Sequence, residues 1–146
     1  LYGARQGEKQ GLAIAHDVAS PSVVRRLEKA IEIGLGSGTA EQKMHKLGDV
    51  IGAGLHVAEA IPCAVGFVAA HPGDPVGAIT GAVNVGYDTD TIATMTGAIV
   101  GALYGAAAFP AHYLPTLEKA NGLPLASLAD RITAIAAARL DKEVLA

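Results

Sequence analysis

GYDTDTIATMTGAIVGALYGAAAFP, residues 86–110, joins an acidic turn to a long segment without charge. Within it, Gly97, Gly101 and Gly105 are four residues apart, so in a helix they lie on one face. Each glycine inside a helix costs roughly 1 kcal/mol relative to Ala, and close backbone packing against a neighbouring helix would offset that cost. We therefore expect a buried, glycine-striped central helix from about Thr91 to Ala107.

The acidic turn before that helix carries the chemical signal of the chain. Asp88 and Asp90 are two residues apart, so in an extended turn both carboxylates reach one side, and Thr91 adds a hydroxyl at the helix start. Carboxylate and hydroxyl oxygens are hard ligands that suit Mg²⁺ or Mn²⁺. Gly86 permits a backbone conformation that other residues resist. The turn therefore indicates a site for a divalent metal.

An ordinary helix N-cap is the competing interpretation of these acids. A cap needs one carboxylate, however, and the second has no capping role. Residues 75–117 contain no Lys or Arg, so neither Asp88 nor Asp90 has a cationic partner nearby in the sequence. A carboxylate in apolar surroundings normally has a partner, a metal or a function. On spacing alone, both interpretations stay open.

Helix-start signals recur along the chain and predict an all-α protein. Ser20-Pro21 provides an N-cap and a proline at the first helical position, and Asp74-Pro75 repeats the pattern. Thr39 and Gln42 match a capping box. No segment has a convincing strand period. The expected helices span about residues 21–34, 40–47, 55–70, 75–85, 91–107, 115–121 and 125–144.

Two of these helices have a clear apolar face that should be buried in a helical bundle. In the first, that face consists of Val24, Leu27, Ala30, Ile31 and Leu35. In the last, it consists of Leu128, Ile132 and Ile135.

Composition excludes several classes of protein. The net charge is −3 and no basic run exceeds the pair Arg25-Arg26, so the chain has no electrostatic footprint for nucleic acid. The single cysteine, Cys63, excludes an internal disulfide and fits a reducing, cytoplasmic compartment. Because nothing near it in sequence would lower its pKa, we expect an inert core thiol. Residues 91–116 are uncharged and long enough to span a bilayer, but their Gly, Thr and Pro content favours a buried helix over a membrane span.

The spacing of the five histidines in the sequence does not match a metal site. No two of them are four residues apart, which argues against zinc bound on a helix face. His71 precedes a proline in a turn and is expected to face solvent. His56 and Glu59 are three residues apart on one predicted helix, where they would form a structural pair.

The acidic turn and glycine-striped helix together resemble the C-terminal motif of the ADP-ribosylglycohydrolase family. The resemblance covers about residues 21–113 and extends upstream to residues 52–62, which look like the helix preceding the motif. The family usually has Gly-Gly before the first Asp, whereas this sequence has Gly86-Tyr87. The residues that carry the resemblance most strongly are Asp88-Thr89-Asp90-Thr91-Ile92-Ala93, Met95, Gly97-Ala98-Ile99, Gly101-Ala102, Tyr104-Gly105 and Pro110.

The resemblance implies an all-α, multi-helical orthogonal bundle with two Mg²⁺ ions, or in some members Mn²⁺. By the family pattern, Asp88, Asp90 and Thr91 would be metal ligands. Gly86 and Tyr87 would lie at the sugar pocket, unless Tyr87 only packs. The implied reaction is metal-assisted hydrolysis of a glycosidic bond that releases ADP-ribose from a modified protein or a small molecule, with the ions binding ribose hydroxyls and activating water. The general acid and base are not identified.

The family's other metal ligands, an acidic cluster near the N-terminus of its members, have no counterpart here. We therefore expect residues 1–146 to form one helical unit that is the C-terminal part of a larger domain and that holds half of a metal site. A missing N-terminal half or a partner chain would supply the other half, and the isolated fragment would have little or no hydrolase activity. The alternative is a non-catalytic helical module of the same descent, since the family includes a lens crystallin.

Overall fold

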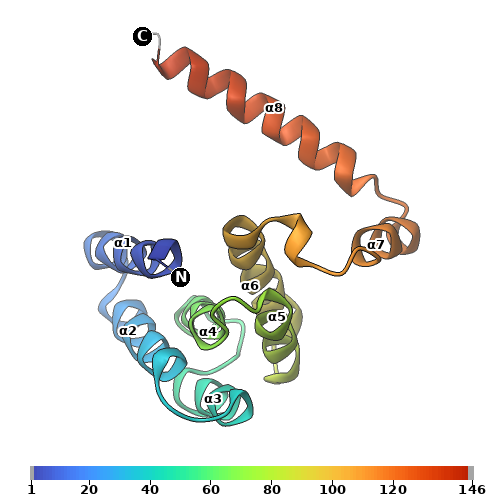
Figure 1. Cartoon of the computed structure of the whole chain (residues 1–146). Helices are drawn as coiled ribbons and strands as arrows, with labels where there is room; N and C mark the ends of the chain where they lie inside the picture. The colour runs from blue at the N-terminus through green and yellow to red at the C-terminus, as the bar shows by residue number, and fades with distance from the viewer. Residues whose placement is uncertain (1, 145–146) are drawn as a thin grey trace. The chain divides into compact units, whose positions relative to one another are not determined.

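The computed structural model describes residues 2–144, and it describes the side chains of residue 7 and residues 9–139. These residues form helices joined by turns and loops, and no strand occurs among them (Figure 1), which confirms the all-α class. The chain divides into two compact units, residues 1–108 and 109–146, which are described separately below.

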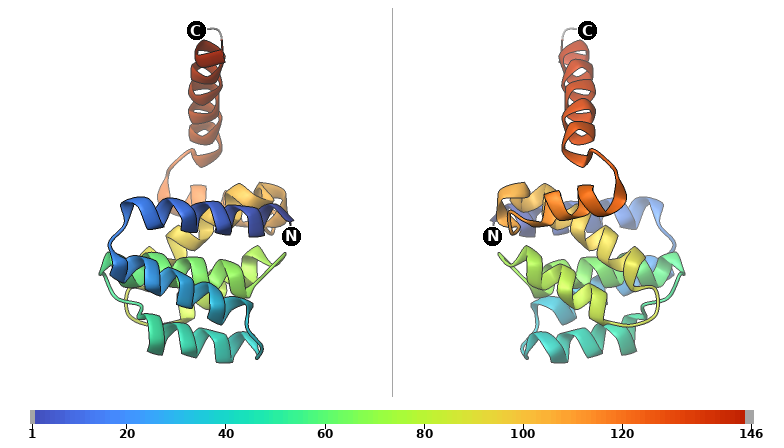
Figure 2. Two further views of the ribbon diagram at one scale, coloured as in Figure 1. Left: turned by 90° about the vertical axis from the view of Figure 1, so that its left-hand side faces the viewer. Right: turned by 90° about the vertical axis from the view of Figure 1, so that its right-hand side faces the viewer.

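Unit 1 contains six α-helices, one π-helical turn and one 3-10 turn. Figure 1 shows α4 at its centre, with α2 on one side and α5 and α6 on the other. In both views of Figure 2, α3 lies at the lower edge of this unit. The elements are α1 (Tyr2–Val18), α2 (Pro21–Leu35), α3 (Ala40–Lys46), η1 (Leu47–Ile51), α4 (Val57–Ala70), α5 (Pro75–Asn84), α6 (Thr89–Tyr104) and η2 (Ala106–Ala108).

The predicted helix starts are confirmed where local side chains define them. Thr39 and Gln42 form the complete capping box at α3: the Gln42 N–H donates to Thr39 Oγ1 at 3.2 Å, and the Thr39 N–H donates to Gln42 Oε1 at 3.0 Å. Asp74 Oδ1 accepts from the Gly77 N–H at 2.8 Å and caps α5. Ser20 precedes α2 as predicted, but its side chain makes no capping hydrogen bond.

Helix α3 ends at Lys46, one residue before the predicted end at residue 47. The chain continues into the π-helical turn η1, and Leu47 at the start of that turn is fully buried. Helix α4 begins at Val57, and Pro62 lies inside it without ending it. Residues 52–56, which the resemblance assigns to a helix, are therefore a loop between η1 and α4.

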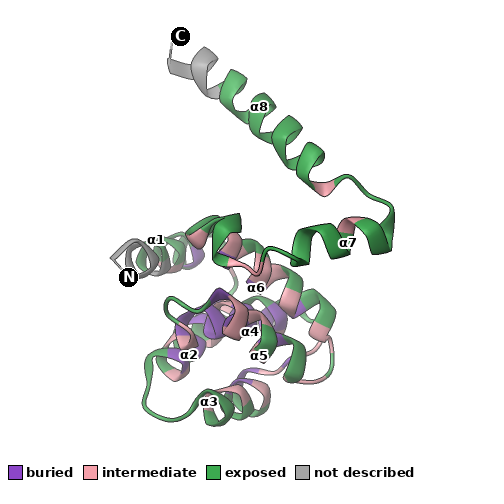
Figure 3. Ribbon diagram, turned by 45° about the vertical axis from the view of Figure 1, so that its right-hand side comes forward, coloured by how far each residue is buried: buried purple, intermediate pink, exposed green. Residues whose placement is uncertain are grey.

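The core of unit 1 is built around α4, whose buried residues are drawn in purple in Figure 3. Small side chains dominate, and Phe67 is the largest fully buried one. The main buried cluster also links the loop before α4 to helix α6, because it includes Ala53 and Ile92 as well as Cys63. Close helix packing therefore replaces large anchors in this core.

The closest helix crossing is between α2 and α4, and not on the glycine stripe of α6. A Cβ at Gly34 of α2 would lie 2.7 Å from the Ala69 Cβ of α4, and a Cβ at Gly66 of α4 would lie 3.2 Å from the Ala30 Cβ of α2. By contrast, a Cβ at Gly101 would meet no atom within 4 Å. The expectation that the stripe mediates close backbone packing is wrong, because Gly105 ends the helix with φ of 75° and Gly97 only touches Ile79.

Helix α6 spans Thr89–Tyr104, so it starts two residues earlier and ends three residues earlier than predicted. In the part of the chain that is described, no helix is both long and apolar enough to cross a membrane.

Unit 2 contains α7 (Tyr113–Asn121) and α8 (Leu125–Val144). Helix α7 ends as predicted at Asn121-Gly122, where Gly122 is left-handed and its N–H donates to the Glu118 carbonyl at 2.9 Å. The predicted core face of α8 is not buried: Leu128, Ile132 and Ile135 remain 48%, 59% and 57% exposed.

Candidate metal centre

The turn before α6 has an unusual backbone at two consecutive residues. Gly86 has φ of 94° and Tyr87 has φ of 58°. Positive φ is natural for glycine and costs a residue with a side chain roughly 1–2 kcal/mol. The turn places Asp88 at the N-cap position of α6.

Asp88 does not behave as an ordinary helix cap. Its carboxylate accepts no hydrogen bond from the backbone of α6. Instead, Oδ1 accepts from the Thr91 hydroxyl at 2.9 Å, and Oδ2 is buried without a hydrogen-bond partner. The capping interpretation therefore does not explain the Asp88 side chain, because a buried oxygen without a partner is destabilising.

Asp90 lies in the first turn of α6, where its side chain is exposed. The extended turn expected around Asp88 and Asp90 is wrong, because the helix already starts at Thr89. Residues two apart do not face each other on a helix, whereas residues three apart do. The structure thus brings Asp88 and Thr91 together, and the assignment of Asp90 as a further ligand stays a prediction.

The loop at residues 52–56 contacts the acidic turn. The Asp88 N–H donates to the Ala53 carbonyl at 2.9 Å. On the other side of this loop, Glu59 Oε2 accepts from the Gly54 N–H at 3.1 Å. Sequence reasoning missed this support, although two glycines shortly before an acidic residue in a helix's first turn could have indicated it.

The expected pairing of His56 with Glu59 is wrong. His56 is the N-cap residue of α4, and its Nδ1 accepts from the Ala58 N–H at 3.1 Å, while Glu59 turns to Gly54. His71 is also not fully solvent-facing: it is half-buried, and its Nδ1 lies 3.0 Å from the Phe67 carbonyl oxygen.

Tyr87 borders a small cavity next to the acidic turn. The cavity has a volume of about 310 Å³ and lies between α3, η1 and the end of α5. The Tyr87 side chain itself is 89% exposed, so it is not packed against the core. Gly86 does not line the cavity. The residues that line it are Met44, His45, Gly48, Asp49, Asn84, Val85 and Tyr87.

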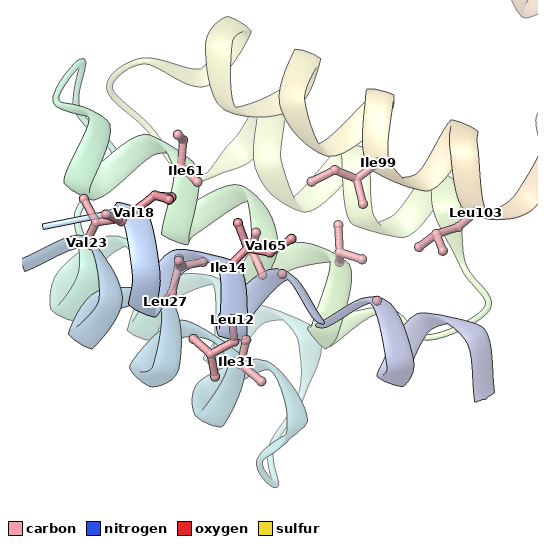
Figure 4. Close-up of a pocket in the computed structure, with 15 residues that line it drawn as sticks. Leu12, Ile14, Val18, Val23, Leu27, Ile31, Ile61, Val65, Ile99 and Leu103 are labelled. Atoms are coloured by element: carbon pink, nitrogen blue, oxygen red, sulfur yellow. The ribbon is translucent and has the colours of Figure 1, made fainter. Parts of the chain in front are cut away.

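A larger cavity of about 500 Å³ lies between α1, α2, α4 and α6 (Figure 4). Leu12, Val65 and Ile99 come from three of these helices, and every residue that lines it is apolar or glycine. Among the described residues that line it, no side chain is titratable or polar, so they supply no group for acid, base or metal chemistry.

Other reactive side chains do not form a competing site. Burial raises the pKa of the Cys63 thiol from 9.0 to about 12, as expected for an inert core cysteine. Among the described residues, no group of three or more His, Cys, Asp or Glu side chains is arranged to hold a metal. The acidic turn, with Asp88 and Asp90, therefore does not form such a group with other described residues.

Comparison with known proteins covers nearly the whole chain. The family model described as ADP-ribosylglycohydrolase matches residues 4–143. The chain is also similar to the uncharacterized protein YegU of Escherichia coli (strain K12), with 35% identity over 126 residues. That match covers 86% of this chain but 37% of the length of the relative. No solved structure matches.

Proposed function

The chain belongs to the ADP-ribosylglycohydrolase family, and from this premise we propose that it forms part of a metal-dependent hydrolase that releases ADP-ribose from a modified protein or small molecule. Membership of the family supports a glycohydrolase type of function. The dependence on a metal, the release of ADP-ribose and the class of substrate are proposals that go beyond family membership. We also propose a cytoplasmic location, where a single reduced cysteine is the usual state.

The observation that carries the proposal is the buried, unpartnered Oδ2 of Asp88. A carboxylate oxygen removed from water needs a cation or a donor. Among the described side chains, no Lys, Arg or His lies within ion-pair distance of Asp88. A hard divalent cation fits this oxygen, and the Thr91 hydroxyl keeps lone pairs available beside it.

When bound, Mg²⁺ or Mn²⁺ would supply Lewis acidity at a sugar oxygen or a water molecule. This chain's own contribution is to hold Asp88 with its backbone tied to Ala53 and its Oδ1 tied to Thr91. Asp90, in the adjacent helical turn, is the third proposed ligand, and Gly86 and Tyr87 are the proposed substrate contacts.

The proposed site is incomplete within this chain. Mg²⁺ prefers six oxygen ligands, with several of them water, and enzymes that use two ions need ligands for both. Asp88, Asp90 and Thr91 are three ligand side chains, which are too few to complete the shells of two ions. We therefore propose that the remaining ligands come from a further N-terminal part of the domain or from a partner chain, and that the 146-residue chain alone has little or no hydrolase activity.

Isothermal titration calorimetry with Mg²⁺ and then ADP-ribose tests the proposal on both the full gene product and the 146-residue chain. We expect the full gene product to bind metal and ADP-ribose, the 146-residue chain to bind metal weakly, and Asp88→Ala to remove binding in the full gene product. Asp74→Ala is the matched control, because Asp74 also sits at a helix N-terminus but caps α5 with its carboxylate. Failure of the full gene product to bind, or no loss in Asp88→Ala, would refute the proposal.

The competing function is a non-catalytic helical module of the same descent. The observation that favours it is that the described residues contain no group of three or more His, Cys, Asp or Glu side chains that could hold a metal. Measurable release of ADP-ribose from an arginine- or serine-linked substrate by the full gene product excludes this alternative, whereas metal binding without turnover supports it.

A further inference from the structure

We propose that Glu59 is a positioning residue of the metal centre, acting on Asp88 through the loop at residues 52–54. This inference rests on the proposed function, since Asp88 is a metal ligand only under it. Glu59 itself belongs to α4 and is separated from Asp88 by 29 positions in the sequence. The link between them consists of contacts made by the intervening loop.

The first contact is between Glu59 and the backbone of Gly54. Glu59 is in the first turn of α4, three residues after the N-cap residue His56. An acidic residue at this position often bonds back to the N–H of the cap residue. Here Glu59 Oε2 reaches past the cap and accepts from the Gly54 N–H at 3.1 Å. The carboxylate thus holds the preceding loop instead of closing its own helix.

The second observation is that two glycines make room for this carboxylate. A Cβ at Gly52 would lie 2.8 Å from the Glu59 carboxyl group, and a Cβ at Gly54 would lie 2.7 Å from Oε2. Real Cβ atoms do not approach other atoms so closely. The loop backbone therefore lies directly against the Glu59 carboxylate.

The third observation is a hydrogen bond that links this loop to the proposed metal site. Ala53 lies between the two glycines and is 2% exposed, and its carbonyl accepts from the Asp88 N–H at 2.9 Å. That N–H belongs to the residue whose Oδ2 is buried without a partner. A displacement of the loop would therefore move the backbone of Asp88 and, with it, the carboxylate.

Glu59 makes this contribution as a hydrogen-bond acceptor. Among the described side chains, no basic group lies within ion-pair distance of it. Glutamine keeps an acceptor oxygen of the same reach, so it can replace the bond to Gly54, whereas alanine cannot. This difference separates a positioning role from a role of the negative charge.

The test compares Glu59→Gln, Glu59→Ala and the control Asp74→Ala. Asp74 makes the same kind of bond, from a glycine N–H to a carboxylate at a helix N-terminus, but at α5. Mn²⁺ affinity is measured on the full gene product by electron paramagnetic resonance, and hydrogen exchange of the Asp88 amide is measured without metal. We expect Glu59→Ala to weaken Mn²⁺ binding about 10- to 100-fold, which is the usual effect of losing an outer-shell partner, and to accelerate Asp88 exchange. We expect Glu59→Gln to stay near wild type.

Gly54→Ala provides a second route in case Glu59→Ala unfolds. Its Cβ should displace the Glu59 carboxylate and weaken Mn²⁺ binding, and combining it with Glu59→Ala should add little, because the displaced group is then absent.

Three results would overturn the inference. If Glu59→Gln weakens Mn²⁺ binding as much as Glu59→Ala does, the effect comes from the negative charge of Glu59 and not from its hydrogen bond. An equal loss of Mn²⁺ affinity in Asp74→Ala would assign it to general destabilisation. Unchanged Asp88 exchange in Glu59→Ala would remove the proposed link. A wild-type protein that binds no Mn²⁺ refutes the proposed function instead, and the exchange measurement keeps the two failures distinct.

Discussion

The loops at residues 52–56 and 86–88 have a similar geometry but differ in how visible they are in the sequence. Each starts at a glycine with φ near 95°, Gly52 at 95° and Gly86 at 94°, and each leads into a helix of the core. In the second loop the proposed ligands are side chains of the loop and the adjoining helix. In the first, the contribution lies in backbone groups that contact Glu59 and Asp88. The sequence motif therefore identifies the loop with the proposed ligands, whereas the loop at residues 52–56, which acts through backbone groups, has no such motif.

The largest expected effect comes from placing the same substitution at the two glycines. Gly52 has ψ of 155° together with its positive φ, a region that is nearly exclusive to glycine. Its Cβ would also displace Glu59, whereas a Cβ at Gly86 meets nothing within 4 Å. We expect Gly52→Ala to lower the free energy of unfolding by about 3 kcal/mol and Gly86→Ala by about 1 kcal/mol. Chemical denaturation measures both. Equal losses would show that Gly52 has no special contact with Glu59.

The next effect concerns the buried core that the loop at residues 52–56 shares with helix α6. Cys63 belongs to the same cluster as Ala53 of the first loop and Ile92 of α6. Burial raises its pKa from 9.0 to about 12, so at pH 8 and below the thiol is almost entirely neutral in both states and contributes little pH dependence. Above pH 9 the unfolded chain loses this proton while the folded chain keeps it, so stability falls as pH rises. By pH 10 the loss should be about 1.4 kcal/mol.

Cys63→Ala is the control for that titration. The variant should lack this component of the pH dependence, so the difference in unfolding free energy between it and the wild type should change between pH 8 and pH 10. Alkylation should also require unfolding. Rapid reaction of native Cys63 with iodoacetamide at pH 8 would contradict the buried, neutral thiol.

Thr96 gives a smaller effect and tests what an unpaired buried oxygen means. It lies in the middle of α6, is fully buried, and its hydroxyl has no hydrogen-bond partner, as is also true of Asp88 Oδ2 at the start of the same helix. Under our proposal, Asp88 has a metal as its partner and Thr96 has none. Thr96→Val should therefore raise the unfolding free energy by about 1 kcal/mol and leave metal affinity unchanged. A loss of stability would indicate that the hydroxyl has a partner after all.

Features with local causes were predictable from sequence. Thr39 with Gln42, and Asp74 with Pro75, define helix starts within four residues, and the structure has both. The acidic turn was recognised from Asp88 and Asp90, but the extended geometry predicted for it is wrong, and the observed bond joins Asp88 to Thr91.

Features with distant causes were not predictable. The spacing of Gly97, Gly101 and Gly105 indicated close packing, but the close crossing occurs at Gly34 and Gly66, whose neighbours come from other helices. The bonds of Asp88 to Ala53 and of Glu59 to Gly54 depend in the same way on how the loops meet after folding. A periodic pattern identifies a face of a helix, but the residue that meets that face is set by the tertiary structure.

The smallest stability effect is expected at Tyr87, where the backbone strain of the acidic turn is not compensated by packing. Its φ of 58° costs a residue with a side chain about 1 kcal/mol, and its ring is 89% exposed. Glycine would remove the strain but raise the entropy of the unfolded chain, so Tyr87→Gly should stabilise the protein by about 0.5 kcal/mol or less.

A strained, exposed aromatic residue beside a cavity is better explained by a ligand than by the fold. In the full gene product we therefore expect Tyr87→Gly to raise the KM for an ADP-ribosylated substrate about 3- to 10-fold, the value of one aromatic contact, with kcat unchanged. Tyr87→Asn, which also tolerates a left-handed backbone but lacks the ring, should give the same KM. If neither variant changes KM, the ring does not contact the substrate, and the strain at this residue has no role in binding.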